Sequence, residues 1–97
     1  MVMIDNRIKQ GVPFGISSIG PNPFHDQFAF DFTLPSDAQV HLQLVSLNGQ
    51  VVYTEEVQGA TGTNHYTFKD ENNLAPGLYI VCIQAGSEIQ TSKIFKY

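Results

Sequence analysis

Apolar and polar residues alternate with a period of two along much of this chain, and this pattern constrains the fold more than any other feature. From Gln27 to Leu34 large apolar residues occupy every second position, and the same pattern runs from Gln39 to Leu44. Successive side chains of a β-strand point to opposite faces, so each segment predicts a strand with one face in a core and one in water. No window of eleven residues matches the 3.6-residue period of an amphipathic helix.

Turn residues divide the remainder into short strands. Asn48-Gly49 predicts a hairpin with a type I′ turn, in which both central residues have positive φ. Gly59–Thr63 predicts a flexible loop, and Gly86-Ser87 predicts a two-residue turn. The predicted strands are Gln27–Leu34, Gln39–Leu44, Val51–Val57, His65–Lys69, Leu78–Ala85, Glu88–Tyr97 and, as a seventh, Ile16–Ile19.

Short antiparallel strands separated by frequent turns predict an all-β fold, an immunoglobulin-like antiparallel β-sandwich of about seven strands. Leu78–Ala85 is apolar at seven of eight positions, which indicates a central strand covered on both faces. The 97 residues suffice for one such domain, predicted to span residues 14–97. Its predicted core includes Phe28, Phe30, Phe32, Leu42, Leu44, Leu78, Ile80 and Cys82.

Residues 1–13 differ from the rest because their alternation is weak and Gly11 and Pro13 oppose strand pairing. We expect them to be a tether or linker from an upstream passenger domain. They lack the continuous apolar region of a signal peptide, since Asp5, Arg7 and Lys9 interrupt it. The protein therefore either stays inside the cell or is a piece of a longer exported protein, and composition leaves both open.

Charge and hydropathy exclude several classes of partner. Residues 21–89 carry eight acidic side chains against one lysine, Lys69. Such an acidic body repels phosphate backbones, so we expect no nucleic-acid partner. No apolar run approaches the roughly 20 residues of a membrane-spanning helix, so we expect no insertion into a bilayer.

Residues capable of chemistry are few and scattered. The predicted positions of His25, His41 and His65 are on the surface, without cysteine or carboxylate at ligand spacing, so no metal site is predicted. The single cysteine, Cys82, lies in the most apolar strand and is interpreted as a small hydrophobic residue. Asp70–Asn73 is interpreted as a solvated turn, because it lacks the ligand spacing of a calcium loop.

Neither a catalytic constellation nor a cofactor motif is found. The sequence has no nucleophile elbow and no glycine-rich phosphate loop. Glu55 and Glu56 are adjacent on a strand, so they point to opposite faces and cannot share a substrate. We therefore expect a protein that is not an enzyme and needs no cofactor.

Tyr79 follows a Leu-x-Pro-Gly corner, as in the tyrosine corner of immunoglobulin-like folds. The Tyr79 hydroxyl is expected to form a hydrogen bond with the backbone a few residues upstream. The spacing to Cys82 is three rather than two, so the antibody-type pattern is not met.

Four short motifs occur in a fixed order. Pro21-Asn22-Pro23 precedes the first strong strand, Gly49 lies in the hairpin, Gly77-Leu78-Tyr79 follows, and the tail is Lys93-Ile94-Phe95-Lys96-Tyr97. This order resembles the type A C-terminal sorting domain of proteins exported by the type IX (Por) secretion system of Bacteroidetes. The resemblance covers about residues 17–97. The tail departs from the family pattern in that it ends with tyrosine rather than lysine.

The resemblance implies a role in secretion. Such a domain is fused behind a passenger that crosses the inner membrane by a signal peptide. It directs the passenger through an outer-membrane translocon to the surface or the medium, and a sortase-like peptidase removes it. The sorting-motif residues carried over by the resemblance are Pro21, Asn22, Pro23, Gly49, Gly77, Tyr79, Lys93, Ile94, Phe95, Lys96 and Tyr97.

Physical chemistry gives some of these residues a structural role as well. Pro21 and Pro23 lack a backbone donor, so we expect their segment to remain an extended lead-in outside the sheets. Lys93 and Lys96 are expected on an exposed edge strand, where lysine discourages aggregation. The translocon could equally read them, and both interpretations stay open. Replacing both with Ala is expected to change stability little.

The alternative function is that of an immunoglobulin- or fibronectin-like binding or adhesion module of a secreted protein. A carbohydrate site would show exposed aromatic residues on one face, and the sequence has no Trp. The aromatic residues that alternation leaves unplaced are Phe14, Tyr53 and Tyr97.

Overall fold

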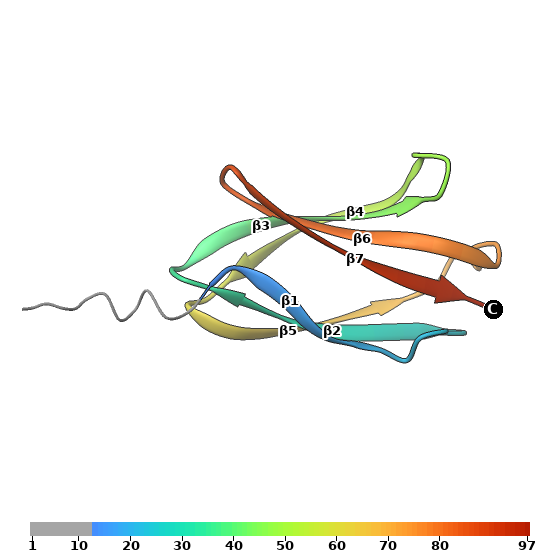
Figure 1. The fold of residues 1–97 in the computed structure, drawn as a ribbon, viewed down its shortest axis with the longest axis horizontal. Helices are drawn as coiled ribbons and strands as arrows, with labels where there is room; N and C mark the ends of the chain where they lie inside the picture. Colours follow the sequence, from blue (N-terminus) through green and yellow to red (C-terminus); the bar gives the residue numbers. More distant parts are fainter. Residues whose placement is uncertain (1–12) are drawn as a thin grey trace, which may run out of the picture.

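The alternating segments form seven strands in two sheets that face each other (Figure 1). The computed structural model describes residues 13–97. That part of the chain contains no helix, hence none that could cross a membrane, so the all-β prediction is confirmed. The strands are β1 (Gly15–Gly20), β2 (Gln27–Leu34), β3 (Ala38–Ser46), β4 (Val51–Gly59), β5 (Gly62–Lys69), β6 (Gly77–Ala85) and β7 (Glu88–Lys96).

The strand order is that of an immunoglobulin-like sandwich. One sheet has the order β1-β2-β5 and the other β4-β3-β6-β7, with antiparallel pairing throughout. In immunoglobulin folds the second strand pairs with the fifth, and the third pairs with the sixth, which also pairs with the seventh. The same pairs occur here, so β6 has neighbours on both sides, as its apolar sequence predicted.

The core lies between the two sheets and is rich in phenylalanine. Phe28, Phe30 and Phe32, predicted from the alternation in β2, are each at most 2% exposed. Leu42 and Leu44 of β3 are buried opposite them, which confirms their prediction as well. The other buried hydrophobic residues are Phe14, Phe24, Leu34, Val40, Phe68, Tyr79, Val81, Ile83 and Ile94.

The predicted core face of β6 is wrong. Leu78, Ile80 and Cys82 were expected inside, but they lie half-buried on the outer face of the sheet. The inward residues are those in between, Tyr79, Val81 and Ile83. A continuous apolar run has no alternation, so it cannot show which face is inward, and a one-residue shift exchanges the faces. The expectation that both faces of β6 are covered is also wrong.

Two turns differ from their predictions. In the β3–β4 hairpin only Gly49 has positive φ, at 90°, and its N–H donates to the Ser46 carbonyl at 2.9 Å. The loop therefore has three residues, with glycine alone in the left-handed conformation, rather than a type I′ turn. The predicted flexible loop Gly59–Thr63 is a tight connection, because β4 runs to Gly59 and β5 begins at Gly62. A side chain at Gly59 would clash with the Leu34 side chain.

The chain enters the sandwich at the end opposite its tail (Figure 1). The predicted tether, residues 1–13, lies outside the described residues except for Pro13. The Pro13 carbonyl accepts a hydrogen bond from the Thr33 hydroxyl at 2.5 Å. Phe14, which the alternation left unplaced, belongs to the core.

The two faces of β6 allow a matched stability test. Ile83→Ala removes a side chain that is fully buried and should cost about 2–5 kcal/mol of unfolding free energy, because it leaves a cavity. Ile80→Ala makes the same chemical change on the outer face and should cost clearly less. Urea denaturation of both variants measures the difference, and equal losses would contradict the assigned faces.

Candidate functional site

The Pro21-Asn22-Pro23 motif lies against the tail of the chain. Its three residues are exposed and outside the strands, but the backbone bends there rather than running extended as expected. Phe24 then forms an isolated parallel bridge with Lys96. The Phe24 N–H donates to the Phe95 carbonyl at 2.8 Å, and the Tyr97 N–H donates to the Phe24 carbonyl at 3.1 Å. The opening motif therefore leads into a short segment that covers the end of β7.

Asn22 adds a side-chain bond to this junction. Its Oδ1 accepts a hydrogen bond from the Phe95 N–H at 2.9 Å. β7 is an edge strand, so this N–H would otherwise face solvent. The flanking prolines cannot donate hydrogen bonds, so the amide of Asn22 is what the motif offers to the strand edge.

Phe24 anchors the same segment in the core. It is fully buried, and its ring centroid lies 4.9 Å from that of Phe28 and 6.5 Å from that of Phe68, in edge-to-face geometry. Phe24 was not among the residues predicted for the core or the sorting motif, because it precedes the alternating segment and the two prolines mark its neighbourhood as a loop.

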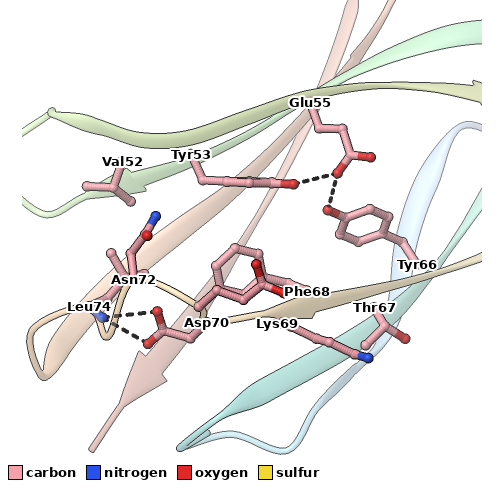
Figure 2. Close-up of a pocket in the computed structure, with 11 residues that line it drawn as sticks. Val52, Tyr53, Glu55, Tyr66, Thr67, Phe68, Lys69, Asp70, Asn72 and Leu74 are labelled. Carbon is pink, nitrogen blue, oxygen red and sulfur yellow. Dashed lines mark hydrogen bonds between the residues drawn. The ribbon is translucent and has the colours of Figure 1, made fainter.

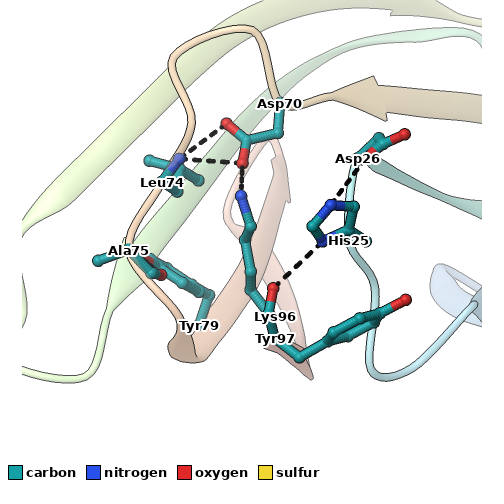
Figure 3. Close-up of polar contacts among 8 residues, drawn as sticks. All are labelled: His25, Asp26, Asp70, Leu74, Ala75, Tyr79, Lys96 and Tyr97. Atoms are coloured by element: carbon teal, nitrogen blue, oxygen red, sulfur yellow. Dashed lines mark hydrogen bonds and ion pairs between the residues drawn. The ribbon is translucent and has the colours of Figure 1, made fainter.

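Lys96 is buried, contrary to its predicted exposure on an edge strand. Its ammonium group pairs with the Asp70 carboxylate, and the two side chains are only 5% and 1% exposed (Figure 3). The same carboxylate accepts the Leu74 N–H at 2.9 and 3.0 Å. Asp70 is thus not part of a solvated turn, because its carboxylate is fully used inside the protein.

The alternation of β7 explains which lysine is buried. Ile94 and Lys96 share the inward face, whereas Lys93 and Phe95 point outward. Lys93 is exposed, as predicted. The sequence held one signal of this burial, because Lys96 is two positions from the apolar Ile94 and so lies on the same face of the strand. The prediction instead followed the general preference of lysine for the surface.

Tyr79 forms the expected tyrosine corner. Its hydroxyl donates to the Ala75 carbonyl, four residues upstream, at 2.6 Å. In the β6–β7 ladder Tyr79 lies opposite Ile94. Gly77 lies opposite Lys96 and has φ of 147°, a conformation that favours glycine. The loop before β6 is therefore held directly against the tail strand.

Most of the predicted sorting-motif residues thus gather at one end of the sandwich, here called the motif end. It comprises residues 21–24, the hairpin residues 47–51, and residues 70–79 and 93–97. The β3–β4 hairpin, which contains Gly49, lies at the same end (Figure 1). The Gly49 N–H bonds within that hairpin, to the Ser46 carbonyl. The exposed members of the predicted set are Pro21, Asn22, Pro23, Gly49, Lys93, Phe95 and Tyr97, and the buried ones are Tyr79, Ile94 and Lys96.

A cleft of about 280 Å³ opens beside the motif end, between β4 and β5 (Figure 2). The Glu55 carboxylate accepts the hydroxyls of Tyr53 at 2.7 Å and Tyr66 at 2.6 Å. These hydrogen bonds hold the pKa of Glu55 below its usual range. Burial, followed by the bond to Glu55, raises the pKa of the Tyr66 hydroxyl. Glu55 lies on β4 and Tyr66 on β5, so their hydrogen bond links the two sheets.

The histidines lie on the strands and turns of the surface, and each has one carboxylate beside it. His65 lies 2.8 Å from Asp31, His25 lies 3.5 Å from Asp26, and His41 contacts Glu56. Residues 13–97 contain no group of three or more His, Cys, Asp or Glu side chains that could hold a metal ion. Cross-strand register brings His65 beside Asp31 and His41 beside Glu56, which sequence spacing did not reveal.

A family model for the secretion system C-terminal sorting domain matches residues 18–97. The chain belongs to this family. It is a type IX secretion sorting domain, a kind of signal domain that is generally non-catalytic and that serves export to the cell surface or the medium. No curated protein matches the chain.

The buried ion pair of the sorting domain gives a stability prediction. Asp70→Ala leaves the Lys96 ammonium group buried without its partner, and it also removes the acceptor of the Leu74 N–H. The expected cost is about 3–5 kcal/mol of unfolding free energy, measured by urea denaturation. The matched surface change Lys93→Ala should stay within about 0.5 kcal/mol. An Asp70→Ala variant as stable as the parent would show that the pair is not buried.

Glu55 gives a prediction on pH. Its folded-state pKa is lowered, so its contribution to stability is fully present above the ordinary carboxyl pKa of 4.5 and is lost as pH falls through the lowered value. The parent should therefore exceed Glu55→Gln in urea midpoint at neutral pH, and the gap should close in acid. Tyr66→Phe keeps the carboxylate but removes one of its two donors. The difference in urea midpoint between Tyr66→Phe and Glu55→Gln should therefore shrink less in acid than the difference between the parent and Glu55→Gln. A gap that does not change with pH would refute this assignment.

Proposed function

We propose that this domain is a non-enzymatic signal that directs a passenger, fused on its N-terminal side, across the outer membrane through the type IX translocon. The family supplies the class of function. The observation that carries the proposal further is the assembly of the motif end. Segments separated by more than 70 residues, such as Asn22 and Phe95, are joined there by direct hydrogen bonds.

The proposed recognition surface is the folded motif end rather than a linear peptide. Its buried members, Tyr79, Ile94 and Lys96, determine the shape of the surface through the core, the corner bond and the ion pair. Its exposed members, above all Lys93, Phe95 and Tyr97, are available to a partner. This division explains how one short tail can serve both stability and recognition.

The position of the chain entry fits a passenger upstream. Gly15 pairs with Thr33 near the end of β2, whereas the motif end lies where β2 begins. A passenger joined through residues 1–13 would then project away from the motif end and leave it accessible. We assign residues 14–97 to the signal and residues 1–13 to the tether from the passenger, and we propose that a sortase-like peptidase removes the domain.

The test is a reporter that carries an inner-membrane signal peptide in front and residues 1–97 behind. In a type IX-competent bacterium we expect the reporter at the surface or in the medium, with the domain removed from it. Export should be lost in a strain that lacks the translocon. Equal export in that strain, or of a reporter without the domain, would refute the proposal.

A double variant tests the exposed residues of the proposed recognition surface. Lys93→Ala combined with Tyr97→Ala changes two exposed side chains, each expected to alter stability by at most about 0.5 kcal/mol, and should lower export several-fold. Lys69→Ala, an exposed lysine on β5, is the control for loss of charge and should be exported normally. A melting curve for each variant separates loss of signal from loss of fold. Normal export of the double variant would exclude Lys93 and Tyr97 from the signal.

A further inference from the structure

Exposed apolar side chains concentrate at the motif end. Among residues 13–97 the large hydrophobic residues with high exposure are Leu47 at 74%, Tyr97 at 62%, Ile89 at 54%, and Val51 and Phe95 at 47% each. All but Ile89 lie at the motif end. Ile89 lies on the same strand as Phe95 but at its opposite end, next to the β6–β7 turn. Single exposed apolar residues are ordinary, but such a grouping indicates an interaction surface.

Cross-strand pairing makes this grouping continuous on the outer face of the four-stranded sheet. Phe95 lies opposite Leu78. Val45 lies opposite Ile80 on one side and Val51 on the other. Leu78, Ile80 and Val45 are half-buried, so each still presents apolar surface. We call the set Leu47, Val45, Val51, Leu78, Ile80 and Phe95 the apolar strip.

The apolar strip borders a groove. A hollow of about 710 Å³ lies between the β3–β4 hairpin and the loop before β6, and Leu47 and Leu78 line it from the two sides. Ala75, Pro76 and Tyr79 also line it on the loop side, and the Tyr79 hydroxyl donates a hydrogen bond to the Ala75 carbonyl of that loop. The groove therefore has firm walls on the β6 side.

One cation lies on this surface. Lys93 is exposed opposite Ile80 and forms no ion pair with another residue of 13–97. Two carboxylates of the motif end and its neighbourhood already have partners, since Glu55 is bound to two tyrosines and Asp70 to Lys96. A surface of apolar side chains with one free ammonium group fits a partner that is apolar with a carboxylate opposite Lys93.

We propose that the apolar strip, with Lys93, is the docking surface for a protein of the secretion machinery that presents an apolar face bearing an acidic group. This proposal rests on the proposed sorting function and adds the chemistry of its partner. Two other occupants fit less well. A second copy would present the same strip, which contains no carboxylate for Lys93, and each of the two chains carries a net charge of −4. An anionic bilayer surface attracts clusters of basic residues, whereas this surface has one lysine in an acidic body.

The test compares serine substitutions in the reporter fused to residues 1–97. Phe95→Ser removes the aromatic side chain but keeps the backbone bonds to Asn22 and Phe24, and export should fall roughly tenfold, as for a central interface residue. Ile89→Ser is the matched control, since it has the same outward orientation and similar exposure on the same strand. It should be exported as the parent is. Lys93→Glu should reduce export more than Lys93→Gln.

The outcomes separate this proposal from the one on which it rests. If the parent domain is not exported, the sorting function fails. If the parent is exported and Phe95→Ser or Leu47→Ser, each folded by its melting curve, is exported equally, the docking proposal fails and the sorting function stands. An equal loss for Ile89→Ser also overturns it. Leu47→Ser decides the matter if Phe95→Ser does not fold, because Leu47 lies in a hairpin outside the tail.

Two measurements on the purified full chain test the other occupants. Binding to vesicles of phosphatidylcholine and phosphatidylglycerol that Phe95→Ser abolishes would overturn the proposal in favour of a lipid surface. A dimer in analytical ultracentrifugation that Phe95→Ser dissociates would overturn it in favour of self-association. A monomer that does not bind these vesicles, combined with the export defect of Phe95→Ser, supports a protein partner.

Discussion

The buried pairing of Lys96 with Asp70 is the interaction on which the motif end depends. It joins the last strand to the loop between β5 and β6, and the same carboxylate holds that loop through the Leu74 N–H. A buried ion pair contributes less to net stability than to the choice of one arrangement, because either partner alone would be strongly unfavourable inside the protein. The tail can therefore occupy its place only when the loop occupies its own.

Much of the fold followed from alternation and turn chemistry. β2 and β3 were predicted with the correct inward faces because polar residues alternate with their apolar ones. β6 was predicted as a central strand but with the wrong inward face. Seven of its eight predicted residues are apolar, so no alternation with polar residues distinguishes the two faces. Only its pairing with β3 and β7, a property of the assembled sheet, decides that Val81 rather than Cys82 lies in the core.

The candidate site was predictable in its members but not in their roles. Ordered motifs identified residues from Pro21 to Tyr97, yet the contacts among them join segments far apart in the chain. Phe24 and Asp70, which are central to the assembled end, were outside the predicted set. A lysine in a terminal strand and an aspartate in a polar loop are both expected to be solvated. The register of β7 with β6 places Lys96 opposite Gly77, and the lysine pairs there with Asp70 inside the protein.

The bridge between Phe24 and the tail also affects when the signal comes into existence. Asn22 and Phe95 are 73 positions apart, so their bond closes almost the whole domain, and contacts of such sequence separation form late in folding. A chain that ends before Lys96 lacks the bridge to Phe24, the ion pair with Asp70 and the covering of the end of β7. The surface at this end can therefore form only when the chain from Asn22 to Lys96 is continuous and folded as one unit.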